Sequence, residues 1–88
     1  MEKKTSCSIE IPNALRMIAF VIEEHWPDMY FGAVPYVAAM YQLNSIHDMY
    51  GADSAESIVR YFLGNAKTWR GDVARAVKQK LNELLKES

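Results

Sequence analysis

Three prolines, at positions 12, 27 and 35, constrain the fold of this chain more than any other feature. A proline fits the first turn of a helix but breaks a helix interior, because it lacks an N–H group and its ring clashes with the preceding turn. The residue before a proline is also pushed out of the helical region. The spacing therefore predicts a first helix over residues 12–25 and a second over residues 35–50, where Gly51 is a typical stop.

The first predicted helix is apolar over much of its surface. Leu15, Ile18, Ala19 and Ile22 form one stripe at helical spacing, and this stripe is widened by Met17, Phe20 and Val21. We therefore expect this helix to be the central one of the fold.

The third predicted helix has the clearest amphipathic pattern. Apolar residues recur at i, i+3, i+4, i+7, i+8 and i+11 from Ala55 to Ala66. Asp53, with Glu56 three residues later, resembles a capping box, so we expect Asp53 to cap this helix.

A fourth helix is predicted to start from a cap at Thr68 or Asp72 and to end near Lys86. The 88 residues form one domain, and the helical periods predict an all-α fold, a small bundle of about four helices around one core. We expect the first and third helices to build that core. Residues 1–10 are expected to be a loose segment, in which Cys7, Ile9 and Ile11 alternate like a short edge strand.

The composition favours a cytoplasmic protein without an enzymatic centre. Cys7 is the only cysteine, so no internal disulfide can form, and the longest apolar run is too short for a signal peptide or a membrane span. Neither His25 nor His47 belongs to a spacing that holds a metal, and the four glycines are dispersed rather than gathered in a phosphate loop. We therefore expect no catalytic residues, no metal, no cofactor and no membrane partner.

The connection between the first two helices is unusually apolar. Its sequence, HWPDMYFGAVPY over residues 25–36, holds residue types that are enriched at protein interfaces. Two interpretations stay open: a lid that folds back over the core, or an exposed surface that binds a partner protein or a second copy of the chain. We expect Trp26, Val34 and Tyr36 to be anchored to the core, and Met29, Tyr30 and Phe31 to have the least to pack against. The candidate partner-binding residues are Trp26, Met29, Tyr30, Phe31 and Tyr36.

The last third of the chain is basic. Residues 60–88 carry seven Lys and Arg against three Asp and Glu, whereas residues 1–59 carry three against eight. Basic side chains beside an aromatic ring such as Trp69 can hold phosphates and stack bases, which makes nucleic-acid binding the alternative function. The other interpretation is a solvated helix face, which the overall net charge of −1 favours. The candidate nucleic-acid-binding residues are Lys67, Arg70, Arg75 and Lys78.

Three stretches of the chain also resemble small uncharacterised proteins of enterobacterial plasmids and prophages. They are IPNALR at residues 11–16, the connection at residues 25–36, and YFLGNA at residues 61–66 continuing through Trp69-Arg70-Gly71. The resemblance covers about residues 11–86, and it implies a bacterial cytoplasm and an accessory gene of a mobile element. Such genes often encode small binders that block or retune host machinery. We therefore expect a non-enzymatic protein–protein interaction module, a regulator or inhibitor of host machinery.

Overall fold

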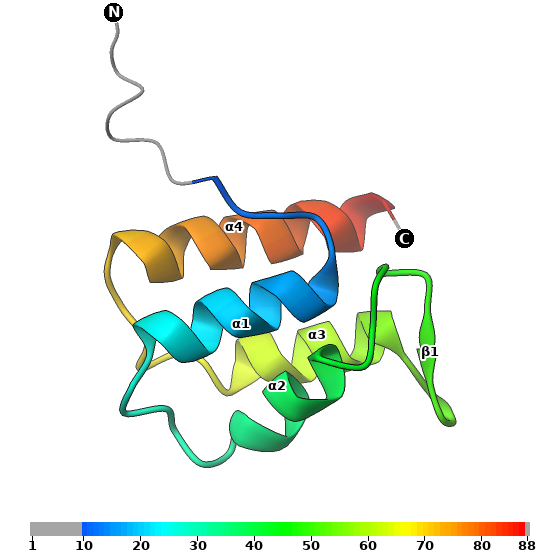
Figure 1. Ribbon diagram of the computed structural model, residues 1–88, viewed down its shortest axis with the longest axis horizontal. Helices are drawn as coiled ribbons and strands as arrows, with labels where there is room; N and C mark the ends of the chain where they lie inside the picture. Colours follow the sequence, from blue (N-terminus) through cyan, green and yellow to red (C-terminus); the bar gives the residue numbers. More distant parts are fainter. Residues whose placement is uncertain (1–9, 88) are drawn as a thin grey trace, which may run out of the picture.

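A computed structural model describes residues 10–87 of the chain, and it is mostly helical, which confirms the predicted class (Figure 1). Four helices are accompanied by a two-stranded antiparallel hairpin that the periodicity did not predict. Within residues 10–87, no helix combines the length and the apolar character needed to cross a membrane. The elements are α1 (Leu15–His25), α2 (Val34–Met40), β1 (Met49–Tyr50), β2 (Asp53–Ser54), α3 (Ala55–Gly64) and α4 (Asp72–Glu87).

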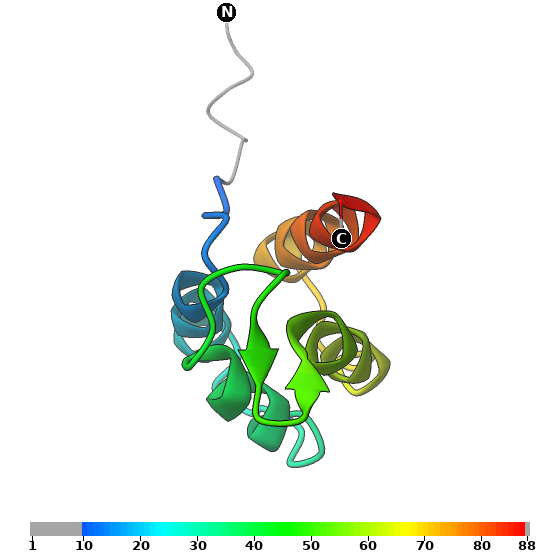
Figure 2. The ribbon, with the colours of Figure 1, turned by 90° about the vertical axis from the view of Figure 1, so that its right-hand side faces the viewer.

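The helices are seen nearly end-on in Figure 2. Helix α2 packs against α1 and α3, and α4 also packs against both of them. Helices α1 and α3 therefore lie diagonally opposite each other, and α2 and α4 add buried residues to those of the two helices that were expected to build the core. All four helices contribute to one cluster of buried apolar side chains.

The predicted inner faces of the helices are largely correct. Leu15, Ile18, Ala19 and Ile22 of α1 are buried, and so are most apolar positions of the third and fourth helices. Met17 and Phe20 are the exception, because they lie on the outer side of α1 and are about half exposed. Helix α1 is thus an amphipathic helix at the side of the fold rather than its central element.

The second helix ends at Met40, about ten residues earlier than predicted. The chain after it is held in a different conformation by two sets of hydrogen bonds. The backbone N–H groups of Leu15 and Arg16 donate to the carbonyls of Asn44 and Leu43, at 3.0 and 2.9 Å. These carbonyls cap the first turn of α1, which has no side-chain cap of its own.

Asp48 fixes the other half of this segment. Its carboxylate accepts hydrogen bonds from the backbone N–H groups of Asn44 at 2.8 Å and Ser45 at 3.0 Å. These two bonds lower the pKa of the Asp48 carboxyl below its ordinary value. The local turn therefore competes with helix propagation, and the chain then forms the hairpin, whose turn contains Gly51 with a φ of 61° that favours glycine.

The caps of the last two helices also differ from the predictions. Ser54 rather than Asp53 caps α3, because the Ser54 hydroxyl accepts from the N–H of Ser57 at 3.1 Å while Asp53 lies in β2. Helix α4 begins at Asp72 and directly follows Gly71, whose φ is 115°, so Thr68 does not cap it. The strand predicted around Cys7 and Ile9 lies outside the described residues.

The position of the α3 cap can be tested by two single substitutions. Ser54→Ala should lower the free energy of unfolding by about 1 kcal/mol, since it removes the acceptor for the Ser57 N–H group. Asp53→Ala should change it by less than about 0.5 kcal/mol, because Asp53 lies in β2 and Ser54 supplies the N-cap acceptor of α3. Urea unfolding curves compare the two variants, and a larger loss in Asp53→Ala than in Ser54→Ala would contradict the assignment.

The turn held by Asp48 predicts a stability that depends on acid pH. A carboxyl whose pKa is lowered by folding stabilises the fold above its unfolded value of 3.8, and this contribution disappears as the pH falls through the lower folded value. The wild-type protein should therefore be more stable than Asp48→Asn at about pH 6, and the difference should shrink at about pH 2. Urea unfolding at both pH values measures the difference, and a gap that stays constant would show that Asp48 does not act through its charge.

Candidate functional site

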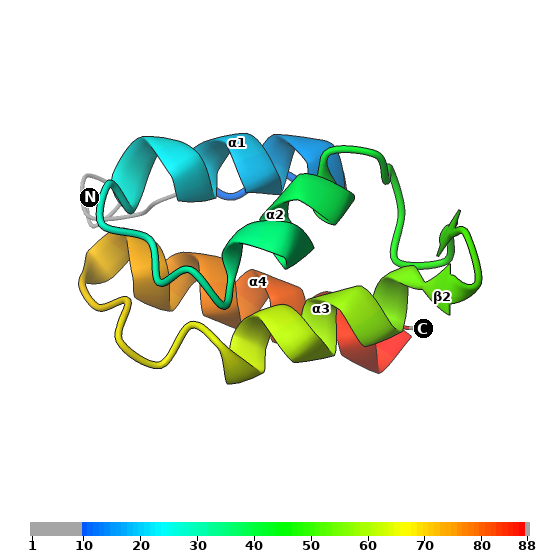
Figure 3. The same cartoon turned by 90° about the horizontal axis from the view of Figure 1, so that it is seen from below.

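The connection after α1 and the connection after α3 reach the same end of the molecule (Figure 3), and a pair of stacked tryptophans joins them. The rings of Trp26 and Trp69 lie parallel, with centroids 5.3 Å apart and planes 7° apart, and Trp26 meets Phe62 edge-on. The indole N–H of Trp69 donates to the carbonyl of His25 at 3.1 Å. Both tryptophans are buried, so the prediction that Trp26 is anchored to the core is confirmed.

The tip of the connection between α1 and α2 is exposed as predicted at two positions. Tyr30 is 44% exposed and Phe31 79% exposed, and their rings are in contact with centroids 4.9 Å apart. Met29 differs from the prediction, because it is half-buried and packs against the core. Val34 also differs: it was expected to be anchored to the core, but it lies exposed on the first turn of α2.

Gly32 allows the Tyr30 ring to fold back toward α3. A Cβ atom at Gly32 would lie 2.5 Å from the Tyr30 ring and 2.8 Å from the Oδ1 atom of Asn65. The Asn65 side chain in turn donates to the carbonyl of Tyr61 at 2.8 Å. The tip of the connection therefore lies against Asn65 at the end of α3, and this contact restricts the position of the Tyr30 ring.

Tyr36 and Tyr61 extend this surface across α2 and α3. Their rings stack with centroids 5.5 Å apart and planes 30° apart, and Tyr61 is 56% exposed. Sequence reasoning missed Tyr61, although it is a large aromatic residue on the polar side of an amphipathic helix. We define the aromatic surface as Tyr30, Phe31, Val34, Tyr36 and Tyr61.

The four basic residues of the alternative prediction lie together. They line a cleft of about 310 Å³ between the connection after α3 and the first turns of α4. Lys78 is the best fixed of them, because its Nζ donates to the carbonyl of Trp69 at 2.7 Å. Burial and the nearby charge of Arg70 lower the pKa of Lys78. We define the basic cleft by its lining, Lys67, Trp69, Arg70, Gly71, Ala74, Arg75 and Lys78.

Trp69 cannot stack on a nucleic-acid base in this arrangement. One face of its ring is covered by Trp26, and only 4% of the residue is exposed. The predicted pairing of basic side chains with a base-stacking tryptophan is therefore wrong, and only the charged groups of the basic cleft face a ligand.

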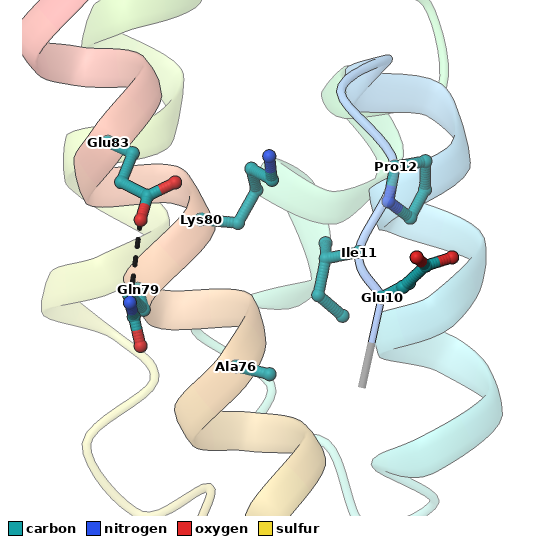
Figure 4. Close-up of a pocket in the computed structure, with 7 residues that line it drawn as sticks. All are labelled: Glu10, Ile11, Pro12, Ala76, Gln79, Lys80 and Glu83. Atoms are coloured by element: carbon teal, nitrogen blue, oxygen red, sulfur yellow. Dashed lines mark hydrogen bonds between the residues drawn. The ribbon is translucent and has the colours of Figure 1, made fainter. Parts of the chain in front are cut away.

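A larger hollow of about 580 Å³ lies between α4 and the segment before α1 (Figure 4). Ile11 and Ala76 come from its opposite walls, and Lys80 donates to the Oδ1 atom of Asn13 at 2.9 Å. The charged groups around it, Glu10, Lys80 and Glu83, form no arrangement typical of acid–base or metal chemistry.

The two histidines lie far apart in the chain and are both exposed. The Nδ1 atom of His25 is 3.0 Å from the carbonyl of Val21, one turn earlier in α1. Among residues 10–87, no group of three or more His, Cys, Asp or Glu side chains is placed to hold a metal ion.

Comparisons of the chain with protein-family models, curated proteins and solved structures find no match.

The division between an anchored and an exposed part of the connection can be tested by unfolding. Trp26→Ala should lower the free energy of unfolding by about 3–5 kcal/mol, because it removes a buried ring that contacts Trp69 and Phe62. Tyr30→Ala should cost less than about 1 kcal/mol, since much of this ring is in water. Urea unfolding of the two variants gives both values, and equal losses would identify the whole connection as a core lid.

Proposed function

We propose that the protein is a non-enzymatic protein–protein interaction module whose aromatic surface binds a partner protein. The observation that carries this proposal is a set of exposed aromatic rings in contacting pairs: Tyr30 lies against Phe31 at the tip of the connection, and Tyr61 of α3 stacks on Tyr36 of α2. Single exposed apolar residues are common on proteins, but a contiguous group of them is typical of an interaction site.

The connection that carries part of the aromatic surface is conformationally restricted, which favours binding. Pro27 and Pro35 restrict the connection on both sides, and Trp26 fixes its start through the stack with Trp69. Side chains that are held in place before binding lose less conformational entropy when a partner arrives. Tyrosine also offers a hydroxyl group beside an apolar ring, so the surface can form hydrogen bonds as well as bury area.

The wider setting of the proposal comes from the resemblance. We place the protein in a bacterial cytoplasm, as an accessory regulator or inhibitor of host machinery encoded by a plasmid or prophage. Its four helices would act as one small bundle around one core, with the aromatic surface at one end. A second copy of the chain is the other candidate partner for this surface.

Nucleic-acid binding remains the second candidate function because Lys67, Arg70, Arg75 and Lys78 line one cleft. Two observations make it weaker: Trp69 has no free face for a base, and the sequence pI is about 6.1. A salt titration with duplex DNA separates the two functions, because binding through phosphates weakens steeply as salt increases.

The proposed function predicts that Phe31 matters for binding and not for folding. Phe31→Ser should change the free energy of unfolding by less than about 1 kcal/mol, because the side chain is largely exposed. The same variant should weaken binding of a captured partner, or self-association, by tenfold or more, as expected for about 1.4 kcal/mol or more at an interface hot spot.

Met49→Ser is the matched control, because Met49 is an exposed apolar residue on the hairpin, outside the aromatic surface. Sedimentation of each variant with and without the captured partner gives the affinities. Equal binding by wild type and Phe31→Ser, with Tyr61→Ser also unaffected, would overturn the proposal.

A further inference from the structure

The basic cleft concentrates four positive charges around a small volume. Lys67 and Arg70 come from the connection after α3, and Arg75 and Lys78 lie three residues apart, on one face of the first turns of α4. Within residues 10–87, the acidic side chain paired with this group is Asp72, 3.4 Å from Arg75, in a contact where both side chains are mostly exposed. Such an exposed pair neutralises little of the field in the cleft.

The position of the Lys78 ammonium is set by the fold. Its Nζ donates to the carbonyl of Trp69, and that residue is held by its stack on Trp26 and its bond to His25. One cation of the cleft is thus fixed by the same contacts that join the two connections. Burial of Lys78 and the nearby charge of Arg70 both disfavour its charged form, so an anion in the cleft would relieve an existing repulsion.

The cleft has the dimensions and donors of a site for one phosphate group. Its volume of about 310 Å³ admits a phosphate and part of the group that carries it. Arginine forms bidentate hydrogen bonds to phosphate oxygens, and lysine supplies a point charge. The backbone N–H groups at the start of α4 add a smaller contribution of the same sign, next to Gly71, which has no side chain to cap them.

Because Trp69 has no free aromatic face, a single phosphate group fits the cleft better than a nucleic acid does. Single-stranded nucleic acid is usually bound by base stacking together with a basic groove that follows the backbone. Here the ring is covered, and the four cations converge on one hollow. We propose that the basic cleft binds a single phosphate monoester dianion, held by Arg70, Arg75 and Lys78 with Lys67 at the rim.

This site does not depend on the aromatic surface being a protein interface. The phosphate could belong to a small metabolite or to a phosphorylated side chain of a partner protein, and both sources present the same dianion to the cleft. The stacked tryptophans place the basic cleft and the connection between α1 and α2 at the same end of the molecule, so one phosphorylated partner could reach both.

The test is a titration of the full-length protein with inorganic phosphate at constant ionic strength. Amide chemical shifts of Gly71 to Ala74 are followed by NMR, and chloride is the reference anion. Wild type should show saturable shifts at these amides, and Arg70→Gln and Lys78→Met should each weaken binding by about tenfold or more, as expected for a charge-assisted hydrogen bond.

Lys86→Gln is the control, because it removes the same charge from the far end of α4, outside the cleft. Arg70 is exposed, so Arg70→Gln should keep the circular dichroism spectrum and melting temperature of wild type and remains informative if Lys78→Met unfolds. Shifts that do not saturate, or equal losses in Arg70→Gln and Lys86→Gln, would overturn the proposal.

Two further ligands identify the source of the phosphate. O-phosphoserine and a phosphopeptide are each used to compete with phosphate. A lower dissociation constant for the phosphopeptide would support a phosphorylated partner, and equal dissociation constants would support a small ligand. Duplex DNA that binds more tightly than phosphate monoesters, with a steep salt dependence and no competition by them, would overturn the single-phosphate site in favour of nucleic acid.

Discussion

The parallel stack of Trp26 on Trp69 is the interaction on which both candidate surfaces depend. The two rings come from connections that are separated by two helices in the chain, and each ring lies at the base of one surface. Aromatic pairs of this kind add about 0.5–1.5 kcal/mol to the effect of burying the rings themselves. Together with the bond from the Trp69 indole to the carbonyl of His25, this contact holds the start of the connection between α1 and α2 and the Trp69 carbonyl that positions Lys78. A local contact in the core thus sets the geometry of two places on the surface.

The helix faces could be predicted because they depend on spacing within one segment. Ile58, Val59 and Phe62 recur at helical intervals, and all three are buried. The end of the second helix could not be predicted, because residues that follow α2 supply the carbonyls of Leu43 and Asn44 that cap α1. That partnership joins positions nearly thirty residues apart and leaves no trace in local periodicity. The predicted position of the α3 cap was wrong by one residue. Asp53 and Ser54 are both good capping residues, and the backbone at Ser54 is the one that places the side chain to accept from the Ser57 N–H group.

The candidate sites show the same limit. The composition of residues 25–36 indicated an unusual connection, and Tyr30 and Phe31 are indeed exposed at its tip. Tyr61 meets Tyr36 only through the packing of α2 on α3. Val34 is exposed because the face of α2 that carries Val37 and Met40 is the buried one. The basic residues were close enough in sequence to be grouped correctly. The role of Trp69 was not predictable, because its partner Trp26 lies in the other connection.

The exposure of Phe31 and Tyr61 is difficult to explain by folding alone. A domain of this size is short of buried apolar area, so a large aromatic side chain left in water forgoes stabilisation that it could supply in the core. The core is nevertheless filled, with Phe62, Leu15 and Met40 almost entirely buried, so these rings are not displaced by a poorly packed interior. Tyr30 is moreover folded back over Gly32 toward Asn65 instead of being spread into solvent, which keeps the exposed rings together. A constraint other than stability, such as the binding of a partner, accounts best for an aromatic group that is both exposed and held in place.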